Sequence, residues 1–360
     1  MGPRPDGEIC MTAKHDNPLG TDGFEFVEFT AADPAPLRAL FEALGFVPTA
    51  RHRHLRITRY QQGDANLLLN EEPSGFAAGF AQAHGPSACG FALRVRDARQ
   101  AAARAVALGA RPVPLSRDYA LDTPVIEGVG GSLLYLVERY GGDRAYEADY
   151  EPLAVPPDRV RGRGILTIDH LTHNVERGQM DVWASFYERI FNFHEVHYFD
   201  IKGVKTGLLS RALTSPDGRV RIPINESADD KSQIAEFLRD YRGPGIQHIA
   251  LGTADIYQTV ESLGQAGIRF LATPAAYYEM VPERIPQHGQ DLKRLERDQL
   301  LIDADPEDRG KILLQIFTEP VVGPIFFEII QRKGNEGFGE GNFRALFLAM
   351  ERDQERRGRL

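Results

Sequence analysis

The feature that most constrains the fold of this chain is an internal duplication. The segment GPSACGFAL at 85–93 resembles GPGIQHIAL at 243–251, and NLLLNEEPS at 66–74 resembles RIPINESAD at 221–229. The strands and helices expected from the hydrophobic pattern also follow one order in both halves. The similar sequence segments and the common order of strands and helices favour a duplicated unit over chance similarity between two α+β domains.

Each half is predicted to consist of two β-α-β-β-β units. Alternating residues predict a strand at 24–30, and an apolar stripe predicts a helix at 34–45. The second half begins in the same way, with a strand at 165–171 and then a helix at 180–191. The stretch 70–87 is expected to be a loop.

These units set the expected domain organisation. Residues 1–22, rich in Gly, Pro and charge, are expected to be a flexible lead-in. One domain is expected over 23–155 and a second over 165–360, with the Pro- and Arg-rich linker 156–164 between them. The chain is thus predicted to be α+β, with two domains and a helix at its C-terminal end.

Composition narrows the partners. Lys and Arg total 42 against 51 Asp and Glu, a net charge of −9, which argues against a broad nucleic-acid surface and favours small-molecule partners. The chain has only Cys10 and Cys89, so a secreted disulfide scaffold is not indicated and a reducing cytoplasm fits. No apolar run approaches the roughly 20 residues that span a bilayer, and no membrane partner is expected.

Three good metal ligands, His170, His248 and Glu328, each lie in a predicted strand of the second half. Glu328 sits in the apolar run PIFFEII, where an unpaired carboxylate would be costly, so a metal ion or a buried arginine must compensate it. Two imidazoles and one carboxylate form the facial set of non-haem Fe(II) enzymes, although zinc or another divalent ion would accept the same ligands.

The duplication supplies an internal control for this trio. The aligned positions of the first half are Phe26 or Val27, Gly90 and Leu136, none of which can bind a metal. A structural role common to both halves is therefore disfavoured. We expect a catalytic second half and a first half that serves as scaffold without metal ligands.

Strand alternation adds neighbours to the trio. Phe walls and neutral amides on one face would suit an aromatic ligand that carries hydroxyl or carboxylate groups. His173 is expected on the opposite face, three residues beyond His170. The pairs that share a parity are Phe326 with Glu328, Gln315 with Phe317, and Pro223 with Asn225.

A Gly-rich reversal, GNEGFGEGNF, begins at Gly334 and is followed by a predicted helix over 342–356. The apolar stripe of this helix is typical of core packing. Because Gly-Phe-Gly directly follows the Glu328 strand, a lid over the metal is an equal alternative.

From about residue 165 to 345 the sequence resembles the 4-hydroxyphenylpyruvate dioxygenases, Fe(II) enzymes of the vicinal oxygen chelate fold. The resemblance rests on IDHLTHNV, TGLLS, RIPINES, KSQI, GPGIQHIAL, LLQIFT, FFEIIQR and GFGEGNF. It implies an open, barrel-like, glyoxalase-like sheet in each half, with His170, His248 and Glu328 as the iron ligands and a lid helix at the C-terminus.

The resemblance also implies a substrate pocket built from residues of these motifs. Gln247 fits this pocket less well than the other residues, because strand alternation turns its side chain away from the face of His248. The residues expected to hold or orient the phenol ring are Gln233, Gln315, Asn225 and Ser210. The further pocket residues are Pro223, Gln247, Phe317, Phe326, Phe338, Asn342 and Phe343.

The implied reaction takes an aromatic 2-oxo acid, 4-hydroxyphenylpyruvate, and O2 to homogentisate and CO2, a step of tyrosine and phenylalanine catabolism. A related hydroxymandelate synthase would hydroxylate the benzylic carbon instead, and Pro223 and Asn225 fit the dioxygenase pattern better. Other classes left open are a non-redox glyoxalase-like isomerase and a catechol-cleaving enzyme. A ligand-sequestering protein would carry no metal ligands in either half, which the trio contradicts. The resemblance also implies a homo-oligomer, a dimer or tetramer.

Overall fold

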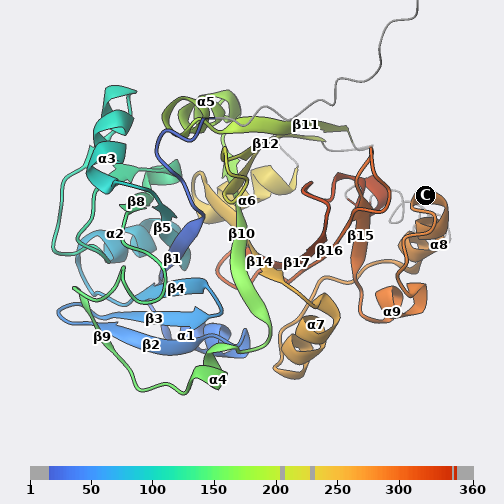
Figure 1. Ribbon diagram of the computed structural model, residues 1–360, viewed down its shortest axis with the longest axis horizontal. Helices are drawn as coiled ribbons and strands as arrows, with labels where there is room; N and C mark the ends of the chain where they lie inside the picture. Colours follow the sequence, from blue (N-terminus) through green and yellow to red (C-terminus); the bar gives the residue numbers. More distant parts are fainter. Residues whose placement is uncertain (1–15, 203–206, 228–231, 343, 347–360) are drawn as a thin grey trace, which may run out of the picture.

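The computed structural model describes residues 16–202, 207–227, 232–342 and 344–346. It contains two β-sheets, one from each half of the chain, which lie beside each other in Figure 1. No helix in the described ranges is long and apolar enough to cross a bilayer.

Within the described residues the first sheet has nine strands, in the order β6-β7-β8-β5-β1-β4-β3-β2-β9. Its first unit is β1 (Phe24–Thr30), α1 (Ala35–Ala43), β2 (Val47–His52), β3 (Ile57–Gln62) and β4 (Ala65–Asn70). Its second unit is β5 (Ser87–Arg94), α3 (Ala98–Ala107), β6 (Pro112–Val113), β7 (Val125–Glu127), the 3-10 turn η1 (Val129–Gly131) and β8 (Leu133–Val137). The two units are joined by α2 (Gly75–His84), and β9 (Tyr150–Pro152) completes the edge.

The second sheet, counted over the described ranges, has eight strands in the order β11-β12-β13-β10-β14-β17-β16-β15. Its first unit is β10 (Ile165–Val175), α5 (Met180–Phe191), β11 (His194–Lys202), β12 (Gly207–Thr214) and β13 (Arg221–Ser227). Its second unit is β14 (Gly245–Thr253), α7 (Ile256–Gln265), β15 (Leu301–Ala304), β16 (Ile312–Phe317) and β17 (Phe326–Lys333). The helices outside these units are α4 (Pro157–Val160), α6 (Gln233–Tyr241), α8 (Ala275–Arg284) and α9 (Leu292–Arg297).

Strand pairing confirms the predicted duplication of the β-α-β-β-β unit. The strand β1 runs parallel to β4 and antiparallel to β5, and β10 runs parallel to β13 and antiparallel to β14. The closing strands β8 and β17 are parallel to β5 and β14 respectively. The predicted loop at 70–87 is wrong, because ten of its residues form α2.

The register corrects one aligned position. In the second half His248 pairs with Phe326, and Glu328 lies two residues after Phe326. In the first half Gly90, the counterpart of His248, pairs with Leu133. The counterpart of Glu328 is therefore Tyr135, two residues after Leu133. The expected counterpart, Leu136, is wrong by one residue. The first half therefore carries a phenol where the second half carries the carboxylate.

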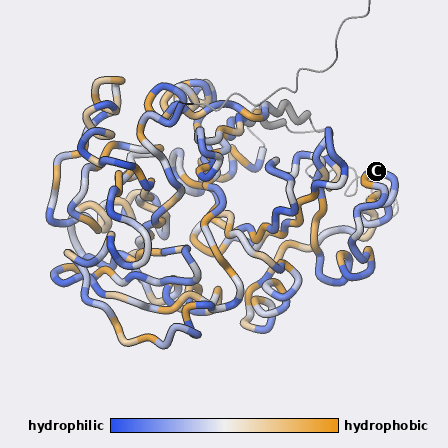
Figure 2. The backbone as a smooth tube through the Cα atoms, viewed as in Figure 1, coloured by the Kyte–Doolittle hydropathy of each residue, from blue (hydrophilic) through white to orange (hydrophobic). Residues whose placement is uncertain are grey.

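Apolar packing occupies both faces of the first sheet. The larger cluster of buried residues includes side chains from both halves, such as Phe29 and Phe327, whose rings lie 6.2 Å apart. A second cluster lies within the first half, where Tyr146 and Tyr150 cover strand residues such as Phe26 and Tyr135. Figure 2 shows hydrophobic stretches in the strands of both halves and alternation with hydrophilic residues along the helices. The face that carries the trio in the second half thus holds aromatic and apolar side chains in the first, together with a buried carboxylate, Glu28, that bonds to Tyr135 and Asn70.

Candidate active site

The predicted trio comes from three adjacent strands. In the register of β10, β14 and β17, His170 and Glu328 flank Ala250 on either side. His248 lies two residues before Ala250, and therefore on the same face of β14. The small side chain of Ala250 leaves the space above it to the three larger ones.

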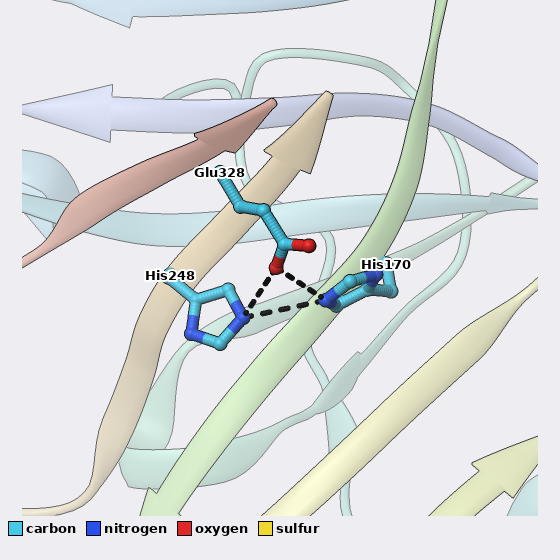
Figure 3. A group of neighbouring side chains, drawn as sticks. All are labelled: His170, His248 and Glu328. Carbon is cyan, nitrogen blue, oxygen red and sulfur yellow. Dashed lines mark hydrogen bonds and ion pairs between the residues drawn. The ribbon is translucent and has the colours of Figure 1, made fainter. Parts of the chain in front are cut away.

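The three side chains point toward one another (Figure 3). Oε2 of Glu328 lies 3.2 Å from Nε2 of His170 and 3.4 Å from Nε2 of His248. The two imidazole Nε2 atoms are 3.3 Å apart. Ligands about 2.1 Å from a metal and at right angles to each other would be separated by about 3 Å. The spacing therefore fits three neighbouring corners of a coordination shell.

Hydrogen bonds fix which imidazole nitrogen carries the proton. Nδ1 of His170 donates to Oδ1 of Asp169 at 2.8 Å, and Nδ1 of His248 donates to Oε1 of Gln247 at 2.9 Å. Both Nε2 atoms therefore present lone pairs to the carboxylate. The second oxygen of Glu328, Oε1, is buried and has no hydrogen-bond partner among the described residues. Three converging lone pairs and an unsatisfied anionic oxygen fit a bound cation.

The electrostatics keep Glu328 anionic. Burial raises the pKa of Glu328, but His170 and His248 in their protonated forms would lower it by more, so that the pKa lies below its usual value. Burial lowers the pKa of His170, while Glu328 and Asp169 raise it by more. For His248 burial prevails and the pKa is lowered. A neutral imidazole and an ionised carboxylate are the forms that bind a metal.

Aromatic rings surround the trio. The ring of Phe326 stacks on His248 at 4.9 Å and 18°. Phe317 lies edge-on to both, with its centroid 6.2 Å from His248 and 6.0 Å from Phe326. Phe338 meets His170 edge-on at 5.5 Å. These contacts supply apolar walls beside the three lone pairs.

A polar network holds the start of the C-terminal segment. Nδ2 of Asn342 donates to Oε1 of the buried Gln315 at 3.3 Å. Oδ1 of Asn342 accepts from the hydroxyl of Tyr277 at 2.6 Å and from Arg284 at 3.2 Å. Residues 340–342 and 344–346 are helical, so the predicted helix begins here, and Phe343 lies outside the described residues.

The remaining polar candidates line β12 and β13. Ser210 pairs with Asn225 across these strands, and Pro223 shares the parity of Asn225. Nδ2 of Asn225 donates to Oδ1 of Asn174 at 3.2 Å. Since Asn174 follows His170 by four residues on β10, these side chains extend the face of the trio.

Two further candidate residues, Gln233 and Gln247, do not lie on β12 or β13. Gln233 is the first residue of α6 and is exposed. Gln247 reaches the site through the ring of His248 rather than through its own strand face. His173 lies on the opposite face, buried, with its Nε2 2.8 Å from the hydroxyl of Tyr187.

Sequence reasoning missed the residues that hold the ligands in place. Asp169 accepts from His170, and Arg332 donates two hydrogen bonds to Asp169, each of 2.8 Å. The hydroxyl of Thr172 lies 3.0 Å from Nε2 of His248. A signal was present, since Asp169 directly precedes a ligand and Arg332 follows Glu328 by four residues on one strand.

A cavity of about 460 Å³ adjoins the site on the side of Phe338. Phe338 contacts His170 and also lines the cavity, so its ring stands between the two. The other lining residues are Val196, Thr214, Asp217, Gly218, Arg221 and Glu336.

Comparison with known families agrees with this geometry. Residues 15–151 match the family model of the N-terminal part of hydroxyphenylpyruvate dioxygenase. Residues 167–279 match the model of the glyoxalase, bleomycin resistance protein and dioxygenase superfamily. Fold and trio thus define a member of this superfamily, with the vicinal oxygen chelate fold.

Individual relatives narrow the class. A 4-hydroxyphenylpyruvate dioxygenase of Pseudomonas aeruginosa is 57% identical over 95% of this chain and 97% of its own length. The hemolysin VllY of Vibrio vulnificus is 55% identical with the same coverage. The solved structure of a triple mutant of 4-hydroxymandelate synthase from Streptomyces coelicolor superposes with a TM-score of 0.79 at 29% identity, over 93% of this chain and 100% of that one. The chain belongs to the 4-hydroxyphenylpyruvate dioxygenase family.

Proposed function

We propose that this chain is an Fe(II)-dependent enzyme that converts 4-hydroxyphenylpyruvate and O2 to homogentisate and CO2. The observation that carries the proposal is the convergence of two imidazole lone pairs and one carboxylate, buried beside aromatic rings. The 57% identity to a dioxygenase of that name supports the choice of substrate.

In this proposal His170, His248 and Glu328 hold the ion, which supplies chelation of the 2-oxo acid and activation of dioxygen. Asp169 and Gln247 keep both imidazoles in the tautomer that the ion requires. The protein thereby presents a ligand set of net charge −1, which leaves an Fe(II) site with charge +1 for the anionic substrate.

The substrate ring would lie between apolar walls. Phe317 and Phe326 form one wall beside His248, and Phe338 covers His170. Phe343, the remaining candidate for a wall of the ring pocket, lies outside the described residues. Rings packed this way orient an aromatic substrate and exclude water.

Neutral polar groups would orient the phenol end. Gln315 is fixed by Asn342, and Asn225 by Asn174, so both amides are held in place before substrate binds. Ser210 and Pro223 lie on the same pair of strands, and Gln233 and Gln247 complete the proposed pocket. We also propose that the protein works in the cytoplasm as a homo-oligomer, within tyrosine and phenylalanine catabolism.

A second candidate product is 4-hydroxymandelate, because the fold also superposes on a 4-hydroxymandelate synthase mutant. The two activities share substrate, metal and CO2 release. They differ only in the carbon that receives the second oxygen atom, so product identification separates them.

The metal is tested by exchange. Protein stripped with a chelator under anaerobic conditions should regain O2-dependent CO2 release from 4-hydroxyphenylpyruvate with Fe(II) and not with Zn(II). Failure of Fe(II) to restore this activity, together with formation of a product without O2 uptake in the Zn(II)-loaded protein, would instead indicate a non-redox, glyoxalase-like enzyme.

A further inference from the structure

The carboxylate that orients His170 is itself held by an arginine from the Glu328 strand. Nε and Nη2 of Arg332 donate to the two oxygens of Asp169, each at 2.8 Å. Oδ1 of Asp169 also accepts from Nδ1 of His170 at 2.8 Å. One guanidinium thus fixes the carboxylate plane, and the carboxylate fixes the plane of the imidazole.

The other end of the same guanidinium binds the segment that covers the trio. Nη1 of Arg332 donates to the carbonyl oxygens of Asn335 at 3.1 Å and Gly337 at 2.6 Å. The next residue is Phe338, whose ring rests against His170. The segment 335–338 and the ligand His170 therefore share one arginine.

A lysine could not make these contacts. Arg332 uses four N–H groups in one plane, two toward Asp169 and two toward the carbonyls, whereas an ammonium group is a single point donor. A second arginine, Arg221, lies 3.8 Å from Asp169 and pairs with Glu336, so it retains the positive charge near the carboxylate if Arg332 is changed.

The first half provides a comparison without a metal site. There Glu25 stands at the position that corresponds to Asp169, and it pairs with Arg94 at 2.6 Å. Arg94 comes from β5 and pairs also with Asp64. A buried carboxylate with an arginine partner is thus common to both halves. Among the described residues, only in the second half does the carboxylate bond to one of the trio, and only there does its arginine donate to segment 335–338.

We infer that Arg332 is a positioning residue, which couples the conformation of segment 335–338 to the orientation of His170 through Asp169. When the segment is seated, the guanidinium is held at both ends and the imidazole is presented to the ion. This inference rests on the metal site of the proposed function and adds to it a link between metal binding and closure of the segment.

The test measures Fe(II) affinity and backbone hydrogen exchange, neither of which requires turnover. Anaerobic competition with a chelator should show that Arg332→Lys and Arg332→Gln weaken Fe(II) binding by about ten- to a hundredfold. In metal-free protein the amides of 335–338 should exchange faster in both variants than in wild type. Arg94→Gln is the matched control, and it should change neither quantity even where it lowers the melting temperature.

The coupling between metal binding and segment 335–338 is measured by the effect of Fe(II) on hydrogen exchange in that segment. Fe(II) should slow exchange at 335–338 in wild type and in Arg94→Gln, and should slow it much less in Arg332→Lys. Fe(II) affinity equal to that of Arg94→Gln, or an Fe(II) effect on exchange as large as in wild type, would overturn the inference. If wild type bound no Fe(II), the proposed function would fail, and unchanged exchange in the metal-free variants would still reject the role of Arg332.

Discussion

At the scale of single residues, the site is defined by lone pairs that face one another. The Nε2 atoms of His170 and His248 and one oxygen of Glu328 lie 3.2 to 3.4 Å apart. An ion placed between these three atoms would contact all of them, so each ligand is expected to be required for binding. The substitution His248→Ala should lower the affinity for Fe(II) at least a hundredfold and abolish turnover. His173→Gln is the matched control, and iron stoichiometry near wild type in His248→Ala would contradict the assignment.

His173 makes a separate prediction about pH. Burial lowers the pKa of His173 to about 3, with Tyr187 beside its ring, whereas the unfolded chain titrates near 6.5. Below pH 6.5 the imidazole of His173 is protonated in the unfolded chain but stays neutral in the folded chain. The free energy of unfolding therefore falls as the pH falls toward 3. Between pH 6 and 5 this loss amounts to about 1.2 kcal/mol.

His173→Gln removes that titration and keeps a hydrogen-bonding group near Tyr187. Urea unfolding of metal-free protein at pH 6 and pH 5 should therefore show a smaller drop in the free energy of unfolding for the variant. Equal drops in both proteins would show that His173 is not the titrating group.

The trio could be predicted from the sequence, because a ligand-type residue in a buried strand stands out when a duplicated half lacks it. Asp169 and Arg332 could not be predicted with equal force. Charged residues are usually solvated, and only the register of β10 against β14 and β17 shows that this pair lies behind His170.

At the scale of elements, the turn after β17 is the most tightly built part of the site. Gly339 has a φ of +78°, and a Cβ there would come within 1.8 Å of Oε1 of Gln315. Gly339→Ala should therefore displace Gln315 or the turn itself. The left-handed backbone of an alanine at this position should lower the free energy of unfolding by about 1 to 2 kcal/mol. In addition, we expect kcat/KM to fall at least tenfold.

A glycine with open space around it serves as the control for that substitution. A Cβ at Gly264 in α7 would meet nothing within 4 Å, so Gly264→Ala should leave kcat/KM unchanged. Steady-state kinetics on both variants make the comparison. Wild-type kcat/KM in Gly339→Ala would show that the turn does not constrain the pocket.

Element prediction succeeded where periodicity was strong and failed where composition misled. The strand β1 and the helix α5 coincide with the predicted ranges, and β10 begins where predicted but continues to Val175. The helix α2 was missed because its sequence GFAAGFAQAH begins with glycine and contains a second, a composition typical of loops. Its helical state comes from packing of Ala77, Phe80 and Ala81 in the core.

At the scale of the whole molecule, the two halves share an apolar core. Phe327 is fully buried and meets Phe29 of the first sheet, while its neighbour Glu328 faces His170 and His248. Phe327→Ala should lower the free energy of unfolding by about 3 to 5 kcal/mol. Because the side chain points away from the ligands, Fe(II) affinity should remain within a few-fold of wild type. Denaturant unfolding and metal titration check both, and unchanged stability would show that the halves do not depend on this contact.

The duplicated architecture and the lack of the trio in the first half could be predicted from the sequence, but the polar groups that the first half carries in its place could not. Sequence suggested a first half without polar groups at the aligned positions, whereas Tyr135 there donates to the buried Glu28 at 2.7 Å. The position of Tyr135 follows from the register of β8 against β5, which no periodicity reveals.

The central claim is that this trio supports oxidative decarboxylation coupled to ring hydroxylation. The most direct measurement supplies anaerobically Fe(II)-loaded protein with 4-hydroxyphenylpyruvate and a known amount of O2, and quantifies O2, CO2 and the aromatic product. The proposed function predicts one CO2 and one homogentisate for each O2 consumed. Accumulation of 4-hydroxymandelate, or of a product formed without O2 uptake, would contradict it.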